Sequence, residues 1–149
     1  KERTYEIYGE LIARADIVSA GVMDILARLK AEGYLIAVCS SADRMKVGFN
    51  FAAIGVDFDF FDCVFTGSDV KRKKPYPDIY LAAAEKLNIP PENCLVVEDA
   101  VNGIQAAKAA KMHNVAVTTH FSAEQLARDA APDFIIAGVH ELFTVLDKA

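Results

Sequence analysis

Residues 74–99 of this 149-residue chain read KPYPDIYLAAAEKLNIPPENCLVVED and decide the fold. Residues 77–87 are predicted to form a helix, because proline fits a first turn and the apolar side chains that follow can share one buried face. The run Cys94–Val97 is short and wholly apolar, which is typical of a strand buried on both faces of a parallel sheet. It ends in Glu98 and Asp99. Because ligands of open parallel sheets bind beyond the carboxyl ends of the strands, this carboxylate pair indicates a binding site.

Small hydroxyl residues follow three other apolar runs in the same way. They are Ser40 and Ser41 after the predicted strand 34–39, Thr66 after 63–65, and Thr118 and Thr119 after 115–117. Taken singly, Ser40, Ser41, Thr66 and Thr118 are each better explained as a helix cap or a turn residue. Taken with the carboxylate pair and a lysine, they predict one polar rim at the carboxyl ends of the strands.

The residue types on this rim suit phosphate chemistry. Adjacent carboxylates suit Mg²⁺, which prefers oxygen ligands and keeps several waters while it binds phosphate oxygens. Lys74 supplies a positive charge for phosphate, and hydroxyls with backbone N–H groups complete a phosphate cradle. The combination indicates phosphoryl transfer, in which catalysis is mostly positioning and charge stabilisation.

The chain resembles the haloacid dehalogenase superfamily, in particular its subfamily of β-phosphoglucomutase and related sugar-phosphate phosphatases. The resemblance covers about Val18 to Val139 and rests on three stretches. These are Ser40 at the end of YLIAVC, the run KPYPDIYLAAAEKLNIPPENCLVVEDAVNGIQAAKAAKM, and the VAVTT strand after it. It implies an α/β fold, a Rossmann-like three-layer sandwich with a parallel sheet, of which the first strand and most of the cap domain are not in this sequence.

The resemblance also implies roles for five residues. Ser40 is similar to the catalytic hydroxyl that hydrogen-bonds the transferring phosphoryl group, and Ser41 would add its backbone N–H to that group. Lys74 is similar to the catalytic lysine that bridges nucleophile and phosphate. Glu98 and Asp99 resemble the acidic pair that holds Mg²⁺, with Asp99 as the direct ligand.

The chain departs from the family at several positions. The family's nucleophile is an aspartate in an N-terminal strand ending Asp-x-Asp-x-Thr, and no such strand precedes Ser40. The stretch 57–59, Asp-Phe-Asp, matches only superficially, because it follows Gly55 in a predicted loop. Lys111 stands where the family commonly has glycine, which predicts local strain at a helix end.

We therefore expect this sequence to belong to a longer polypeptide whose upstream segment supplies the strand. Residues 1–17 are predicted to be the end of a helical cap domain and its return to the core, and residues 18–149 an incomplete core domain. The intact protein is predicted to be a Mg²⁺-dependent phosphatase or phosphomutase of a small phosphorylated metabolite, acting through an aspartyl-phosphate, and these 149 residues alone are predicted to be inactive. The alternative is a non-catalytic phosphate-binding or regulatory module without a nucleophile. A phosphonate hydrolase or a dehalogenase of the same fold is less favoured by the rim residues.

Composition restricts the partners and the compartment. A formal charge of −5 disfavours nucleic acid, and no apolar stretch approaches the roughly 20 residues that span a bilayer. Three cysteines without metal spacing, all within predicted strands, indicate a reducing, cytoplasmic compartment. The three histidines are interpreted as surface or loop residues. Further predicted helices span 20–31, 43–53, 103–110, 122–129 and 140–146, and a last strand spans 134–136.

Overall fold

The computed structural model describes residues 21–148. They fall into two compact units that divide between Lys71 and Arg72. The predicted end of a cap domain, residues 1–17, lies outside the described residues. Within residues 21–148, no helix is long and apolar enough to cross a membrane.

The described part of the first unit builds a small parallel sheet and two helices around aromatic side chains. Its elements are α2 (Val22–Ala31), β1 (Ala37–Cys39), α3 (Arg44–Ala53), a 3₁₀ turn (Phe58–Phe60) and β2 (Cys63–Phe65). Val38 of β1 lies opposite Val64 of β2 in parallel register. Phe51 of α3 packs against Phe61, with ring centroids 4.9 Å apart, and both rings are buried. This cluster anchors α3 and therefore the loop between β1 and α3.

The second unit alternates helices with three parallel strands. Its elements are α4 (Asp78–Leu87), a 3₁₀ turn (Pro91–Asn93), β3 (Leu95–Glu98), α5 (Val101–Ala109), β4 (His113–Val117), α6 (Ala123–Asp129), β5 (Phe134–Ile136), a 3₁₀ turn (Val139–Glu141) and α7 (Leu142–Leu146). The strands lie in the order β3-β4-β5. Crossover helices between parallel strands pack on the faces of the sheet, as the sequence pattern predicts.

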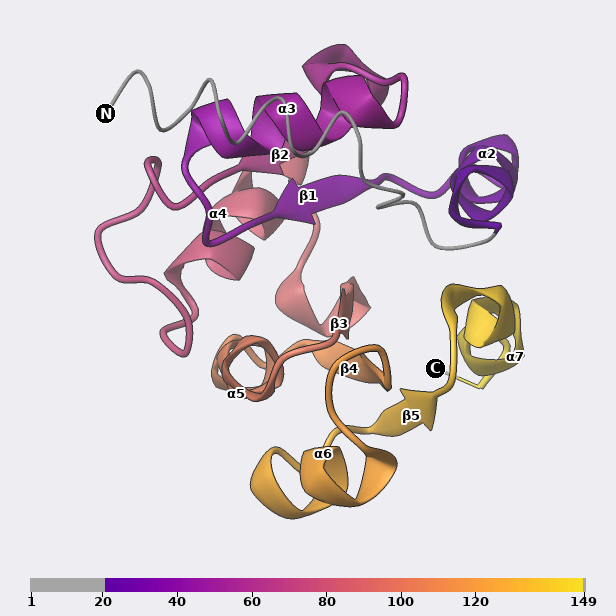
Figure 1. Cartoon of the computed structure of the whole chain (residues 1–149). Helices are drawn as coiled ribbons and strands as arrows, with labels where there is room; N and C mark the ends of the chain where they lie inside the picture. The colour runs from indigo at the N-terminus through magenta and orange to yellow at the C-terminus, as the bar shows by residue number, and fades with distance from the viewer. Residues whose placement is uncertain (1–20, 149) are drawn as a thin grey trace. The chain divides into compact units, whose positions relative to one another are not determined.

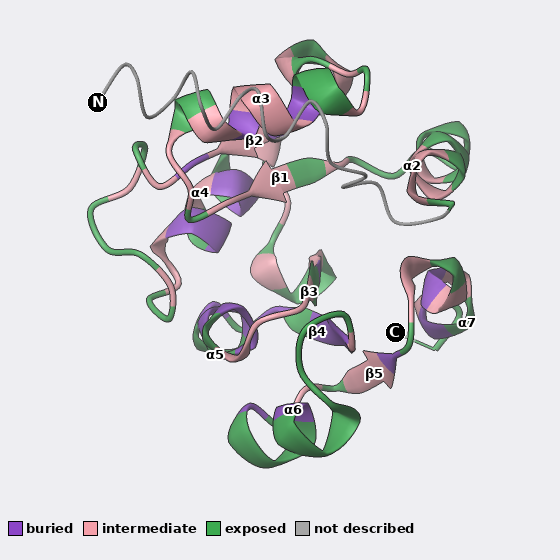
Figure 2. Ribbon diagram, viewed as in Figure 1, coloured by how far each residue is buried: buried purple, intermediate pink, exposed green. Residues whose placement is uncertain are grey.

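Helices cover both faces of this three-stranded sheet (Figure 1). Ala116 of β4 packs with Ile104 of α5 and Leu126 of α6 on one face. Val115 and Val117 point to the other face and pack with residues that include Val145 of α7. All of β4 except His113 is accordingly buried, as is the inner side of α5 (Figure 2). The layered α/β architecture with a parallel sheet is thus confirmed.

Four strands, β1, β2, β3 and β5, each pair with only one other strand in the described part of the chain. There, β1 pairs only with β2, and β3 pairs only with β4. Unpaired strand edges expose backbone donors and acceptors that another strand can satisfy. The resemblance to the dehalogenase superfamily predicts a further strand at the edges of β1 and β3.

Four predictions about the strands are wrong in detail. The strand predicted over 115–117 begins two residues earlier, because His113 and Asn114 also pair with β3. The strand predicted over 34–39 contains only Ala37–Cys39, because the N–H of Tyr34 donates to the carbonyl of Leu29 and so belongs to the turn that ends α2. Cys94 lies outside β3, because its N–H closes the preceding 3₁₀ turn on Pro91. The sequence predicts that Val97 is buried, yet it is 39% exposed.

Helix ends follow from local chemistry. Asp43 caps α3 by accepting the N–H of Lys46, and Ser122 forms a capping box with Gln125 at the start of α6. The helix predicted from residue 103 begins two residues earlier, at Val101. The helix predicted over 140–146 divides into a 3₁₀ turn and α7. Lys111 has a φ of 59°, which confirms the predicted strain after α5.

Candidate active site

A buried ion pair lies at the carboxyl end of β3. Lys74 reaches Glu98, the last residue of β3, and the two side chains are only 7% and 11% exposed. Lys74 precedes Pro75 across a cis peptide bond in the loop that leads into α4. A charge so far removed from water requires a partner, and each residue supplies one for the other.

Both carboxylate oxygens of Glu98 are occupied. Oε1 accepts from Lys74 and, at 3.0 Å, from the hydroxyl of Tyr80. Oε2 accepts the backbone N–H groups of Asp99, at 3.1 Å, and Ala100, at 3.2 Å. These two amides immediately precede α5, so the side chain of Glu98 fixes the turn that leads from β3 into this helix.

The Glu98 carboxylate also requires glycine at position 103. A Cβ atom on Gly103 would lie 2.1 Å from the Cδ of Glu98 and 2.3 Å from Oε1. Gly103 is in the first turns of α5, so the missing side chain leaves room for the carboxylate at the N-terminus of that helix.

Asp99 is in a different environment from Glu98. Its Oδ2 atom accepts from the hydroxyl of Thr119 at 3.2 Å and lies 2.8 Å from Nδ1 of His120. Thr119 and His120 follow β4, the strand beside β3, so two neighbouring strand ends meet here. The Asp99 side chain is 44% exposed, and its Oδ1 atom makes no hydrogen bond or ion pair with any described residue.

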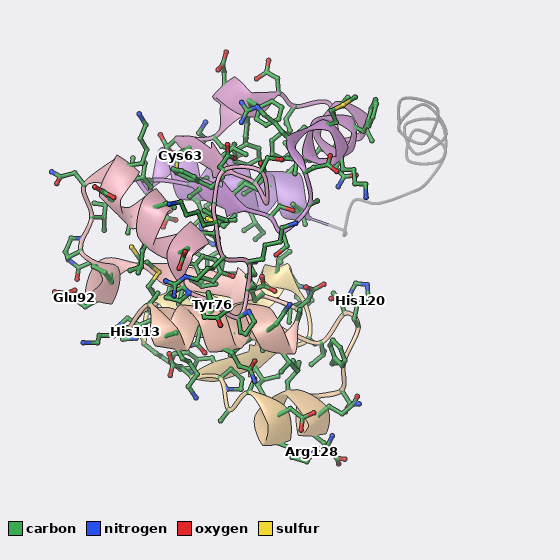
Figure 3. The ribbon with its side chains drawn as sticks, turned by 90° about the vertical axis from the view of Figure 1, so that its left-hand side faces the viewer. Cys63, Tyr76, Glu92, His113, His120 and Arg128 are labelled. Atoms are coloured by element: carbon green, nitrogen blue, oxygen red, sulfur yellow. The ribbon has the colours of Figure 1, made fainter. Side chains whose placement is uncertain are left out.

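The three histidines lie on the surface, as predicted. His113 begins β4 and His120 follows its other end, so the two project from opposite sides of the unit (Figure 3). His120 contacts a predicted site residue, a contact that the sequence did not indicate.

The fit of a metal ion to this rim depends on Asp99. Within residues 21–148, no three His, Cys, Asp or Glu side chains gather as a set that could hold a metal. Mg²⁺ does not need such a set, since it is commonly bound by one or two carboxylates, waters and substrate phosphate oxygens. Asp99 offers one such carboxylate oxygen, whereas both oxygens of Glu98 already have donors.

The loop that carries Lys74 is closed by a second ion pair. The guanidinium of Arg72 binds both carboxylate oxygens of Asp78, at 3.1 and 2.8 Å, and lies 4.8 Å from the centre of the Tyr76 ring. The hydrogen bonds from Arg72 hold the pKa of Asp78 below its usual value. The pair spans the cis peptide bond, so it joins the two ends of the Lys74 loop.

The predicted serines lie in the first unit, in the loop that follows β1. The hydroxyl oxygen of Ser40 accepts the N–H of Ala42 at 3.2 Å, and its proton is donated to no described residue. Gly67 donates its N–H to the carbonyl of Ala42 at 2.8 Å, and a Cβ there would lie 2.3 Å from the carbonyl oxygen of Ser41. The loops after β1 and β2 are therefore packed directly on each other.

The loop after β2 is fixed by its own hydrogen bonds. Asp69 Oδ2 accepts both the N–H and the hydroxyl of Thr66 at 2.7 Å. These bonds, led by the one from the hydroxyl, lower the pKa of Asp69. Thr66 is fully buried, so its hydroxyl serves this turn and does not face a ligand.

The predicted site residues thus form two sets, each within one unit. Ser40 and Ser41 follow β1 in the first unit. Lys74, Glu98 and Asp99 lie together in the second unit, where Lys74 contacts Glu98. Sequence reasoning missed Tyr80, although its position six residues after Lys74 on the buried side of α4 is a signal that could have indicated it.

Comparison with known proteins gives one family. The family of haloacid dehalogenase-like hydrolases matches residues 2–111. Among curated proteins, the chain is 42% identical over 137 residues to the chloroplastic protein SUPPRESSOR OF QUENCHING 1 of Arabidopsis thaliana, a match that covers 91% of this chain and 13% of that protein. It is 32% identical over 139 residues to phosphoglycolate phosphatase of Escherichia coli K12, a match that covers 93% of this chain and 55% of the enzyme.

A solved structure extends this similarity to the fold. A mutant form of CbbY from Rhodobacter sphaeroides, in complex with xylulose-(1,5)bisphosphate, superposes with a TM-score of 0.85 at 29% identity. The match covers 95% of this chain and 63% of that chain. This chain therefore spans less than two thirds of the length of these relatives.

Proposed function

We propose that this chain, which belongs to the family of haloacid dehalogenase-like hydrolases, is the core of a phosphatase for small phosphorylated metabolites. One observation carries the proposal most directly. A buried lysine is held by Glu98 at the end of a parallel strand, and the next residue, Asp99, offers a carboxylate oxygen without a partner among residues 21–148. Cation and carboxylate are the groups that phosphate and its metal ion require.

Lys74 and Ser40 are proposed to bind the phosphoryl group. Lys74 would neutralise charge on the phosphate oxygens, and its partner Glu98 keeps the ammonium in place while that happens. Ser40 would donate its hydroxyl proton to a phosphoryl oxygen, because the N–H of Ala42 already occupies a lone pair of the hydroxyl oxygen. The backbone N–H of Ser41 would add a further donor.

Asp99 is proposed to hold Mg²⁺ directly, with Glu98 as the neighbouring acidic residue. The metal, when bound, would offset negative charge on the phosphate and on the attacking group. Thr119 and His120 hold Oδ2 of Asp99, which leaves Oδ1 for the metal. Glu98 would add negative charge near the metal and would keep Lys74 in place through their ion pair.

The phosphoryl acceptor is proposed to be an aspartate of the full-length protein that none of the described residues supplies. The acceptor carboxylate would take the phosphoryl group as the bond to the leaving oxygen breaks, and water would then release inorganic phosphate. Asp57 and Asp59 are poor candidates, because they lie at the 3₁₀ turn after α3 and Oδ1 of Asp57 accepts the N–H of Asp59. An upstream segment of the same chain and a cytoplasmic location remain predictions.

Measuring turnover distinguishes an enzyme from the alternative, a non-catalytic phosphate-binding module. We propose to assay the full-length protein for phosphate release from a panel of sugar phosphates and other small phosphomonoesters, with Mg²⁺ and with a chelator. Mg²⁺-dependent release from at least one compound supports the phosphatase. Binding of inorganic phosphate without release from any compound supports the module, and halide release from 2-haloacids supports a dehalogenase.

A further inference from the structure

Tyr80 is the residue of this site to which sequence analysis assigns no role. It lies in the first turns of α4, only 5% exposed. Its hydroxyl donates to Oε1 of Glu98 at 3.0 Å, and the centre of its ring lies 4.9 Å from Nζ of Lys74. One side chain therefore contacts both members of the buried ion pair.

The two contacts of Tyr80 act on Lys74 in different ways. The hydroxyl and Lys74 share one oxygen of Glu98, so the hydroxyl takes up part of the negative charge that would otherwise be directed at the ammonium. The ring face offers the ammonium a weaker, uncharged attraction. Lys74 is thus fixed in place while part of its charge remains available to an anion.

The backbone of the turn between β3 and α5 completes this arrangement. Oε2 of Glu98 is held by the N–H groups of Asp99 and Ala100, so the carboxylate cannot follow Lys74 without losing these two hydrogen bonds. Four donors from three segments of chain hold Glu98, and Tyr80 is the only one of them that is an uncharged side chain.

We propose that Tyr80 is a positioning residue, which keeps Lys74 available for phosphate by sharing the carboxylate of Glu98. The proposal rests on the proposed function, because the anion in question is the phosphate group of the substrate. Without the hydroxyl, Oε1 of Glu98 pairs with Lys74 alone, and a phosphate group must compete with a complete carboxylate charge.

The test is the substitution Tyr80→Phe in the full-length protein, with Tyr76→Phe as the matched control. Both substitutions remove one phenolic hydroxyl, but Tyr76 is 52% exposed and its ring contacts Arg72. We expect Tyr80→Phe to weaken the binding of inorganic phosphate, measured by calorimetry, by about tenfold, which corresponds to about 1.4 kcal/mol. Tyr76→Phe is expected to change it less than about twofold, a shift of under ~0.5 kcal/mol.

A second readout does not require phosphate. We expect the amide hydrogens of Asp99 and Ala100 to exchange faster with solvent in Tyr80→Phe than in Tyr76→Phe, because their acceptor carboxylate is less firmly held. If Tyr80→Phe binds phosphate as tightly as the wild type, Tyr80 does not keep Lys74 available for phosphate, and the proposal is overturned. If the exchange rates of the two amides are unchanged, the Tyr80 hydroxyl does not hold the carboxylate of Glu98 in place. Wild-type protein that neither binds phosphate nor releases it from any ester overturns the proposed function and, with it, the role of Tyr80 toward an anion.

Discussion

The contact between Gly103 and Glu98 makes the substitution Gly103→Ala a sharp test of the site's construction. The new methyl group would lie 2.1 Å from Cδ of Glu98, so the carboxylate must move away. Moving it separates Lys74 from its partner and releases the amides of Asp99 and Ala100. Breaking a buried ion pair costs about 3–5 kcal/mol.

Replacing glycine by alanine normally stabilises a helix. Alanine is favoured over glycine in a helix interior by about 0.8–1.0 kcal/mol. The net expectation for Gly103→Ala is therefore a loss of about 2–4 kcal/mol in the free energy of unfolding, measured by urea denaturation. Gly48→Ala in α3 is the matched control, because its new methyl group would meet only the Phe58 ring at an ordinary 3.6 Å.

The free energy of unfolding of Gly48→Ala is expected to rise by up to about 1 kcal/mol, because alanine has the higher helix propensity. If Gly103→Ala is stabilised as much as Gly48→Ala, the carboxylate of Glu98 does not occupy the space at the start of α5. The described network around Lys74 would then be refuted.

Three further predictions concern local structure. Ser122→Ala removes the capping box with Gln125 and is expected to lower the free energy of unfolding by about 1 kcal/mol, measured in urea; an unchanged value would contradict the cap. Lys111→Gly relieves a positive φ of 59° and is expected to raise that free energy by about 1 kcal/mol, whereas a loss would show that the lysine side chain stabilises the turn. The pKa of Asp69 is lowered by Thr66, so its stabilising effect is present above the unfolded pKa of about 3.9 and is lost as the pH falls through the lower folded value. The stability advantage of wild type over Asp69→Asn, followed by circular dichroism, should therefore shrink in acid; a difference that does not change with pH would refute this.

The fold was predictable where apolar runs are bounded by clear turn residues. The strands Cys63–Phe65 and Phe134–Ile136 have the bounds that the sequence predicts. β1 is shorter than predicted, because Tyr34 continues an apolar run in sequence while its N–H completes the turn after α2. Apolar content alone does not show which backbone partner a residue takes.

The site was predictable in its residue types and not in its contacts. Lys74, Glu98 and Asp99 stand out in sequence because a cation and two carboxylates lie next to predicted element ends. The sequence does not show which carboxylate binds Lys74. That depends on which carboxylate accepts the N–H groups of Asp99 and Ala100, just before α5. From the sequence, Tyr80 is expected to be an aromatic residue of the core. Only the hydrogen bond from its hydroxyl to Glu98 indicates a role in the site.

The most direct measurement of the central claim is the rate of Mg²⁺-dependent phosphate release by Asp99→Asn in the full-length protein. Asp129→Asn is the control, because Asp129 is an exposed carboxylate paired with the adjacent Arg128. We expect Asp99→Asn to lose at least about 100-fold in turnover, with an unchanged unfolding midpoint, while the control keeps wild-type turnover. Wild-type turnover and wild-type Mg²⁺ dependence in Asp99→Asn would contradict the assignment of this strand end as the catalytic site.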